Sequence, residues 1–93
     1  MIGRATGPRV GITGLGVNVP AQVMTNDDLA QYVDTSNEWI RSRTGIAERR
    51  IAGPDEALTD VARPAVAAAL ADAGVSADSI DLFICATVAP DML

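Results

Sequence analysis

Three residues of this 93-residue chain have types and a spacing suited to binding a nucleotide. Thr35, Trp39 and Arg43 follow one another at intervals of four, and on a helix such residues lie on one face. An indole offers a flat, polarizable surface on which a base can stack, and a guanidinium can make a forked contact with a phosphate. The spacing is therefore that of half a nucleotide clamp.

A second interpretation makes Trp39 a core residue, because large aromatic side chains usually pack inside a protein. Arg41 and Arg43 would then be solvated, or paired with Glu38 and Glu48. The local charge fits either interpretation. Residues 34–50 hold four of the seven arginines and sum to +1, so the rest of the chain sums to -6 and the whole to -5. From spacing alone, both interpretations stay open.

No catalytic set is visible among the other reactive residues. Cys85 is the only cysteine, and a catalytic thiolate needs an activating base or a helix N-terminus. The chain contains no histidine, and we expect Cys85 to be a small buried residue in the middle of a strand. The acidic pairs at 27–28 and 55–56 fall at helix starts or turns, where carboxylates usually stabilise the backbone.

The glycines of GITGLG, residues 11–16, do not form a dinucleotide-binding fingerprint. That motif is ordered G-x-G-x-x-G and leads directly into a helix, whereas here the order is G-x-x-G-x-G and residues 17–20 are VNVP. We expect these glycines instead to allow close packing of a strand against its neighbours.

Composition indicates one small globular unit, because 48% of the residues are apolar and the mean hydropathy is +0.21. Aromatic residues make up only 3% of the chain, so the core that it could build alone is modest and a larger protein is indicated. The negative net charge argues against nucleic acid or an anionic membrane as a partner. No apolar run is long enough to span a bilayer, and we expect a cytoplasmic protein.

Capping signals predict two short helices around the candidate clamp. Thr25 is a suitable N-cap for a helix that ends near Val33. A second helix is predicted over 36–43, with Thr35 and Glu38 as its capping box and Gly45 at its C-terminal end.

The remaining pattern predicts an α/β protein. Residues 9–18 and 80–89 read as strands, the second apolar on both alternations as in a covered parallel sheet. Residues 47–53 read as a short strand or an extended link. Apolar spacing predicts a helix over 58–73 that Gly74 ends. Pro64 inside it indicates either a kink or a regular part that begins near the proline.

The motif DTSNEWIRSRTGI, residues 34–46, resembles the N-terminal part of the β-ketoacyl-acyl-carrier-protein synthase III family. The family pattern is D-T-S-x-E-W-I-x-x-R-T-G-I, and the likeness extends from about Val10 to Leu93. It implies that residues 1–93 are an N-terminal segment of a thiolase-like α/β domain that pairs as a homodimer. It implies no cofactor, with acyl-CoA as a substrate.

The resemblance also implies a reaction, in which an active-site cysteine takes an acyl group from acyl-CoA and condenses it with malonyl-acyl-carrier protein. In the family, the tryptophan stacks on the CoA adenine, while the threonine and arginine contact the nucleotide and phosphates. These roles fall on Trp39, Thr35 and Arg43. No catalytic residue can be assigned, because the family's cysteine, histidine and asparagine follow the last predicted strand. A polyketide-priming or acyl-transfer relative, and a non-catalytic interaction module, stay open as alternatives.

Overall fold

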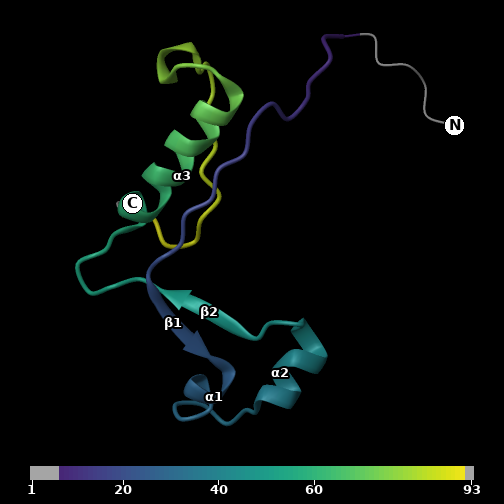
Figure 1. Cartoon of the computed structure of the whole chain (residues 1–93), viewed down its shortest axis with the longest axis vertical. Coiled ribbons are helices and arrows are strands. Elements are labelled where there is room, and N and C mark those ends of the chain that lie inside the picture. The colour runs from purple at the N-terminus through teal and green to yellow at the C-terminus, as the bar shows by residue number, and fades with distance from the viewer. Residues whose placement is uncertain (1–6, 92–93) are drawn as a thin grey trace, which may run out of the picture.

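The computed structural model describes residues 7–91. Residues 1–6 and 92–93 of the predicted 1–93 segment lie outside the described residues. The described chain has two lobes (Figure 1). One holds a two-stranded ribbon with two short helices, and the other holds a long helix flanked by extended chain. In order, the elements are β1 (Gln22–Thr25), α1 (Asn26–Leu29), α2 (Asn37–Thr44), β2 (Glu48–Ile51), α3 (Leu58–Ala73) and the 3-10 turn η1 (Ala77–Ser79).

The ribbon forms the stem of the first lobe. β1 and β2 pair antiparallel, with Gln22 opposite Ile51 and Thr25 opposite Glu48. The predicted strand at 47–53 is confirmed as β2, whereas β1 has no counterpart among the predicted elements. Both helices of this lobe lie between the two strands in sequence and fold at one end of the ribbon (Figure 1).

The predicted N-cap of α1 is confirmed, but the helix is shorter than expected. The Thr25 hydroxyl accepts a hydrogen bond from Asp28 N–H at 3.1 Å, and the Asp28 carboxylate accepts one from Thr25 N–H at 2.9 Å. Regular helix ends at Leu29 and not near Val33. Residues 31 and 32 bond three residues back, so the chain tightens into turns there.

The start of α2 differs from the prediction by one residue. Ser36 is the N-cap, and its hydroxyl accepts from Trp39 N–H at 3.1 Å, so the expected capping box of Thr35 and Glu38 is wrong. Serine and threonine are both good caps, and the serine lies at the position whose side chain reaches the third helical N–H. Gly45 ends the helix with φ 73°, as predicted.

The long helix has the predicted bounds. α3 runs without a break from Leu58 to Ala73, and Gly74 follows in the left-handed conformation with φ 70°. The helix begins six residues before Pro64, which excludes a start at the proline. Pro64 is the seventh residue of the helix, so the Asp60 carbonyl lacks the backbone donor four residues ahead, although the helix continues through this position.

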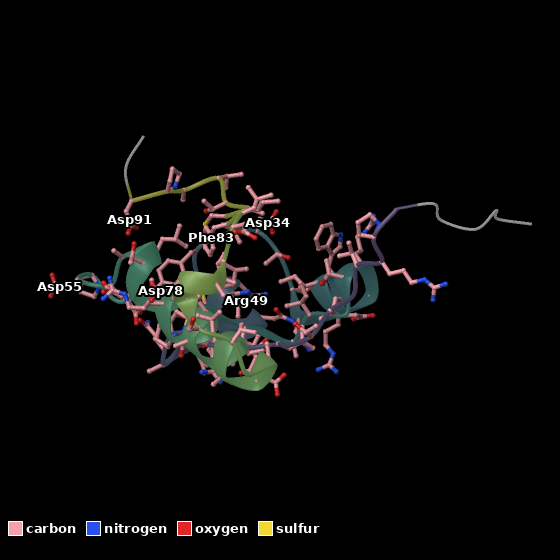
Figure 2. All side chains as sticks on the ribbon, turned by 90° about the horizontal axis from the view of Figure 1, so that it is seen from above. Asp34, Arg49, Asp55, Asp78, Phe83 and Asp91 are labelled. Carbon is pink, nitrogen blue, oxygen red and sulfur yellow. The ribbon has the colours of Figure 1, made fainter. Side chains whose placement is uncertain are left out.

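A carboxylate from the far end of the chain caps α3. The N-cap position is Ala57, which offers no side-chain acceptor. Asp91 instead accepts from Leu58 N–H at 2.7 Å, from Thr59 N–H at 3.0 Å, and from the Thr59 hydroxyl. The described C-terminal end therefore lies beside the first turn of α3 (Figures 1 and 2).

The two predicted strands at 9–18 and 80–89 are not strands in this structure. Both segments run extended alongside α3 without a hydrogen-bonded partner strand (Figure 1). The second is exposed, with Ile84 80% accessible, and Cys85 is exposed too, so the expected burial of that cysteine is wrong. An apolar segment becomes a covered strand only where neighbours pair with it.

Close packing is confirmed for Gly14 and Gly16 but not for Gly11, which has no neighbour within 4 Å, and the neighbour of the other two is a helix. A Cβ built on Gly14 would lie 2.5 Å from the Ala69 carbonyl oxygen, and one on Gly16 would overlap the Ala65 carbonyl oxygen. The segment is also tied to α3 by a bond from Leu15 N–H to the Asp72 carboxylate at 3.0 Å. Glycine at 14 and 16 allows the extended chain to contact the α3 backbone.

The side chains buried in the described residues are few. Ile40 of α2 is 7% exposed and Asn26 at the start of α1 is 1% exposed. Both lie in the lobe of the ribbon, and so the best-packed part of residues 7–91 is the part that carries the candidate clamp. No helix within these residues is long and apolar enough to cross a membrane.

Candidate functional site

A pocket of about 310 Å³ lies at the start of α2. It is lined by Asp34, Thr35, Ser36 and Trp39. The Thr35 hydroxyl oxygen is buried and has no hydrogen-bond partner. A buried hydroxyl without a partner costs free energy, so a side-chain rotation that brings this hydroxyl to a polar partner would be favoured. Two of the three predicted site residues, Thr35 and Trp39, thus border one cavity.

The core interpretation of Trp39 is wrong for the described chain. Its side chain is 53% exposed, whereas the next residue, Ile40, is buried. Consecutive residues of a helix point in directions about 100° apart, so burying Ile40 leaves the indole beside the pocket. An exposed indole can offer a face to a ligand.

Arg43 lies against the indole. Its guanidinium carbon is 5.0 Å from the centroid of the Trp39 ring, a cation–π contact one helical turn along α2. The predicted shared face is therefore confirmed for Trp39 and Arg43. Thr35 precedes the helix and its cap, so it does not share the helix face; it shares the pocket with Trp39, and Arg43 is not among the residues that line that pocket.

A buried polar group that sequence reasoning missed supports this helix. The Asn26 amide donates to Asn37 Oδ1 at 2.9 Å and to the Ile46 carbonyl at 2.7 Å, and it accepts from Arg49 at 2.6 Å. Arg49, labelled in Figure 2, reaches it from β2. From sequence alone, an asparagine next to a helix cap would be taken for a local capping residue. Its supporting role for α2 is visible only from its partners at 37, 46 and 49.

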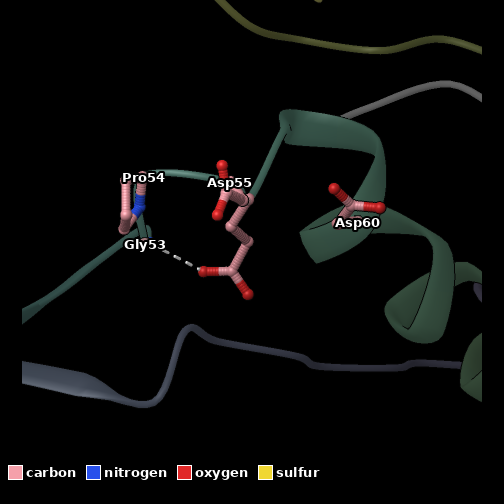
Figure 3. A pocket seen from close by; sticks show the side chains of 5 residues that line it. Gly53, Pro54, Asp55 and Asp60 are labelled. Atoms are coloured by element: carbon pink, nitrogen blue, oxygen red, sulfur yellow. Dashed lines mark hydrogen bonds between the residues drawn. The ribbon is translucent and has the colours of Figure 1, made fainter.

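The acidic turn at 53–60 is a second hollow, but it holds no catalytic pair. The Glu56 carboxylate accepts from Gly53 N–H at 3.0 Å and so closes the turn (Figure 3). Asp60 accepts from Ala57 N–H at 2.9 Å, at the start of α3. The backbone turns at residues 54 and 55, and Glu56 N–H donates to the Gly53 carbonyl at 3.1 Å, so the prediction that the carboxylates at 55 and 56 belong to a turn is confirmed.

Comparison with known proteins finds relatives that share one name. No family model matches the chain. It is 64% identical over 83 residues to beta-ketoacyl-[acyl-carrier-protein] synthase III of Symbiobacterium thermophilum, covering 89% of this chain and 25% of that protein. With the protein of the same name from Prochlorococcus marinus, it is 52% identical over 87 residues, covering 94% and 26%. The chain thus spans about a quarter of the length of these relatives.

Two solved structures share its fold. The 3-oxoacyl-[acyl-carrier-protein] synthase III of Aquifex aeolicus matches 75% of this chain and 22% of its own, at 50% identity and a TM-score of 0.67. The priming beta-ketosynthase of the R1128 polyketide pathway matches 81% and 24%, at 37% identity and a TM-score of 0.67.

The fold and these neighbours define the chain as a thiolase-like α/β protein. Within that class it is a homologue of the β-ketoacyl-acyl-carrier-protein synthase III family, so the resemblance predicted from the motif at 34–46 is confirmed.

Proposed function

We propose that the chain is part of an acyltransferase that condenses an acyl-CoA starter with malonyl-acyl-carrier protein, and that residues 34–43 form the CoA-binding entrance. The observation that carries the proposal is the exposed Trp39 indole, with Arg43 against it and the unpartnered Thr35 hydroxyl beside it. The indole supplies a stacking surface, and Arg43 supplies a cation one helical turn away. Thr35 supplies a hydrogen-bonding group and lines the same pocket as the indole.

The charges at the site favour one orientation of the ligand. Asp34 gives the pocket a carboxylate, which repels phosphate and accepts hydrogen bonds from an amino or hydroxyl group. The base and ribose of CoA therefore belong in the pocket with Asp34 and Thr35. The phosphates belong toward Arg43, whose N–H groups can donate while its face contacts the indole.

The rest of the enzyme belongs to residues outside the described segment. Exposed apolar side chains at 10–19 and 82–88, such as Val10 at 95% and Val88 at 104%, favour burial against further parts of the protein. The thiolate, its base and the oxyanion site would come from those parts. We expect the complete enzyme to work as a cytoplasmic homodimer.

Replacing Trp39 tests the proposal in the full-length protein. Loss of base stacking costs about 1–3 kcal/mol per base. Trp39→Ala should therefore raise the KM for acyl-CoA by roughly 5- to 150-fold. Turnover of an enzyme acylated beforehand should change little. Tyr32→Ala is a matched control, because Tyr32 is an aromatic residue that is 75% exposed and lies outside the pocket. An unchanged KM in Trp39→Ala would contradict the CoA role.

Two other functions are separable by experiment. A polyketide-priming role is favoured by the likeness to the R1128 priming ketosynthase, and competition between starter acyl-CoAs and between carrier proteins would reveal it. A non-catalytic binding module would instead give a saturable change in Trp39 fluorescence when CoA is added to the isolated 93 residues.

A further inference from the structure

We infer that Asn26 is a positioning residue of the nucleotide site: it holds both ends of α2 and thereby sets where Trp39 stands. The inference rests on the proposed CoA role of α2. Asn26 lies outside the pocket, so any effect on ligand binding has to pass through the helix.

One buried amide group connects the two ends of the helix. Asn37 is the first residue of α2, and Ile46 lies two residues after its last. The Asn26 amide nitrogen donates to both, to Asn37 Oδ1 at 2.9 Å and to the Ile46 carbonyl at 2.7 Å. Because Asn26 is only 1% exposed, water cannot readily replace either bond.

The same side chain fixes α2 to the ribbon. Asn26 Oδ1 accepts from Arg49 Nη2 at 2.6 Å, and Arg49 Nη1 donates to the Met24 carbonyl at 3.3 Å. The Asn26 backbone N–H also donates to the Ala47 carbonyl at 3.2 Å. Only an amide combines two donors and an acceptor in one planar group of this size. Asparagine is therefore the residue type that fits position 26.

Removing the hydrogen bonds of the Asn26 amide should move α2 without unfolding it. The Ser36 cap and the Gly45 ending flank α2 directly and stay in place when Asn26 changes. The packing of Ile40 also remains. What is lost is the attachment of the helix to β1 and β2, and with it the fixed distance between Trp39 and the rest of the binding surface.

Three variants of the full-length protein test this inference. Asn26→Asp keeps the shape and the acceptor for Arg49 but removes both donors. Asn37→Ala removes only one acceptor, at an exposed position where alanine favours the helix. Asn18→Ala is the matched control, because its amide donates to the Val61 carbonyl at 2.8 Å in the other lobe.

The measurements are the KM for acyl-CoA and the turnover of pre-acylated enzyme. We expect the KM to rise on the order of tenfold in Asn26→Asp and several-fold in Asn37→Ala. Turnover of the pre-acylated enzyme should stay within about twofold, and Asn18→Ala should leave the KM unchanged. If Asn26→Asp fails to fold, Asn37→Ala alone decides, since an unchanged KM there overturns the inference.

A double-mutant cycle separates positioning from an independent effect. If Asn26 acts through the position of Trp39, Asn26→Asp should raise the KM less in a Trp39→Ala background than in the wild type. Additive effects would overturn the inference. A large effect of Trp39→Ala together with silent Asn26 and Asn37 variants would overturn the positioning role alone. A silent Trp39→Ala would overturn the proposed function, and the inference with it.

Discussion

The Arg43 guanidinium carbon lies 5.0 Å from the centroid of the Trp39 ring, one turn further along α2. The contact joins a cation to an aromatic surface before any ligand arrives. It restricts the rotation of both side chains, so less freedom is lost when a ligand binds.

Arg43 should contribute to CoA affinity through both its charge and its forked donors. We expect Arg43→Met to weaken CoA binding to the full-length protein on the order of tenfold, and Arg43→Lys to weaken it less. Added salt should reduce the affinity of the wild type more than that of Arg43→Met. Calorimetry at two salt concentrations measures both effects. Arg41→Met, on the same helix but away from the indole contact, is the control, and equal affinities in all variants would contradict the expectation.

The carboxylate of Asp34 should reveal which end of CoA enters the pocket. With the base and ribose beside it, Asp34→Asn loses a charge-assisted hydrogen bond, and CoA affinity should fall a few-fold. With a phosphate beside it, the same change removes a repulsion and the affinity should rise. Titration of CoA into the wild type and Asp34→Asn gives the sign, and tighter binding would reverse the proposed orientation.

Asp91 should make the fold sensitive to acid. The Thr59 hydroxyl, followed by the Thr59 backbone N–H, holds the pKa of the Asp91 carboxyl below its usual value. A group whose pKa is depressed on folding stabilises the protein above its unfolded pKa, and that stability is lost as the pH falls through the folded pKa. We therefore expect wild-type stability to drop below about pH 4.

Asp91→Asn should lower the stability at neutral pH and flatten that drop, and Thr59→Val should move the acid transition to higher pH. Chemical denaturation at several pH values between about 2.5 and 7 would measure the loss of stability and the shift of the acid transition. The Asp28 carboxyl, whose pKa the Thr25 N–H and hydroxyl lower, contributes in the same direction. Comparing the wild type with Asp91→Asn and Thr59→Val separates the contribution of Asp91 from that of Asp28. Identical pH profiles of stability in all three proteins would contradict the role of Asp91 in acid sensitivity.

The glycines beside α3 should differ sharply in their tolerance of alanine. A Cβ at Gly16 meets the α3 backbone at Ala65 and Ala69, whereas a Cβ at Gly11 meets nothing within 4 Å. Gly16→Ala should destabilise the protein by about 1–3 kcal/mol, as overpacking does. Gly11→Ala should be close to neutral. Thermal unfolding of the two variants checks this pair, and equal melting temperatures would rule out the close approach.

Local signals in the sequence predicted the local features well. The Thr25 cap and the Gly45 and Gly74 helix ends all depend on residues within a few positions of each other. The neighbouring Ser36 displaced Thr35 as the α2 cap because two good caps stand side by side, and propensity cannot rank them.

Features that depend on distant partners were missed or misread. The strand β1 exists because residues 48–51 pair with it, and its own sequence carries little strand signal. The role of Asn26 depends on partners 11 to 23 residues away. Conversely, residues 80–89 have a strand pattern but no pairing partner in the described chain, and so Cys85 is exposed. The spacing of Trp39 and Arg43 located the candidate site, but its pocket could be found only in three dimensions.

The ribbon joins the first lobe to the rest of the chain at one place, the pair Gln22 and Ile51. Everything that supports the pocket, including Asn26 and its hydrogen-bond partners, lies between these two residues. Such a segment can open and close as a single cooperative unit, independently of α3. The backbone amides protected in this segment would then share one free energy of opening in hydrogen exchange. A graft of residues 22–51 between related enzymes would likewise carry the whole binding surface through a single two-stranded junction.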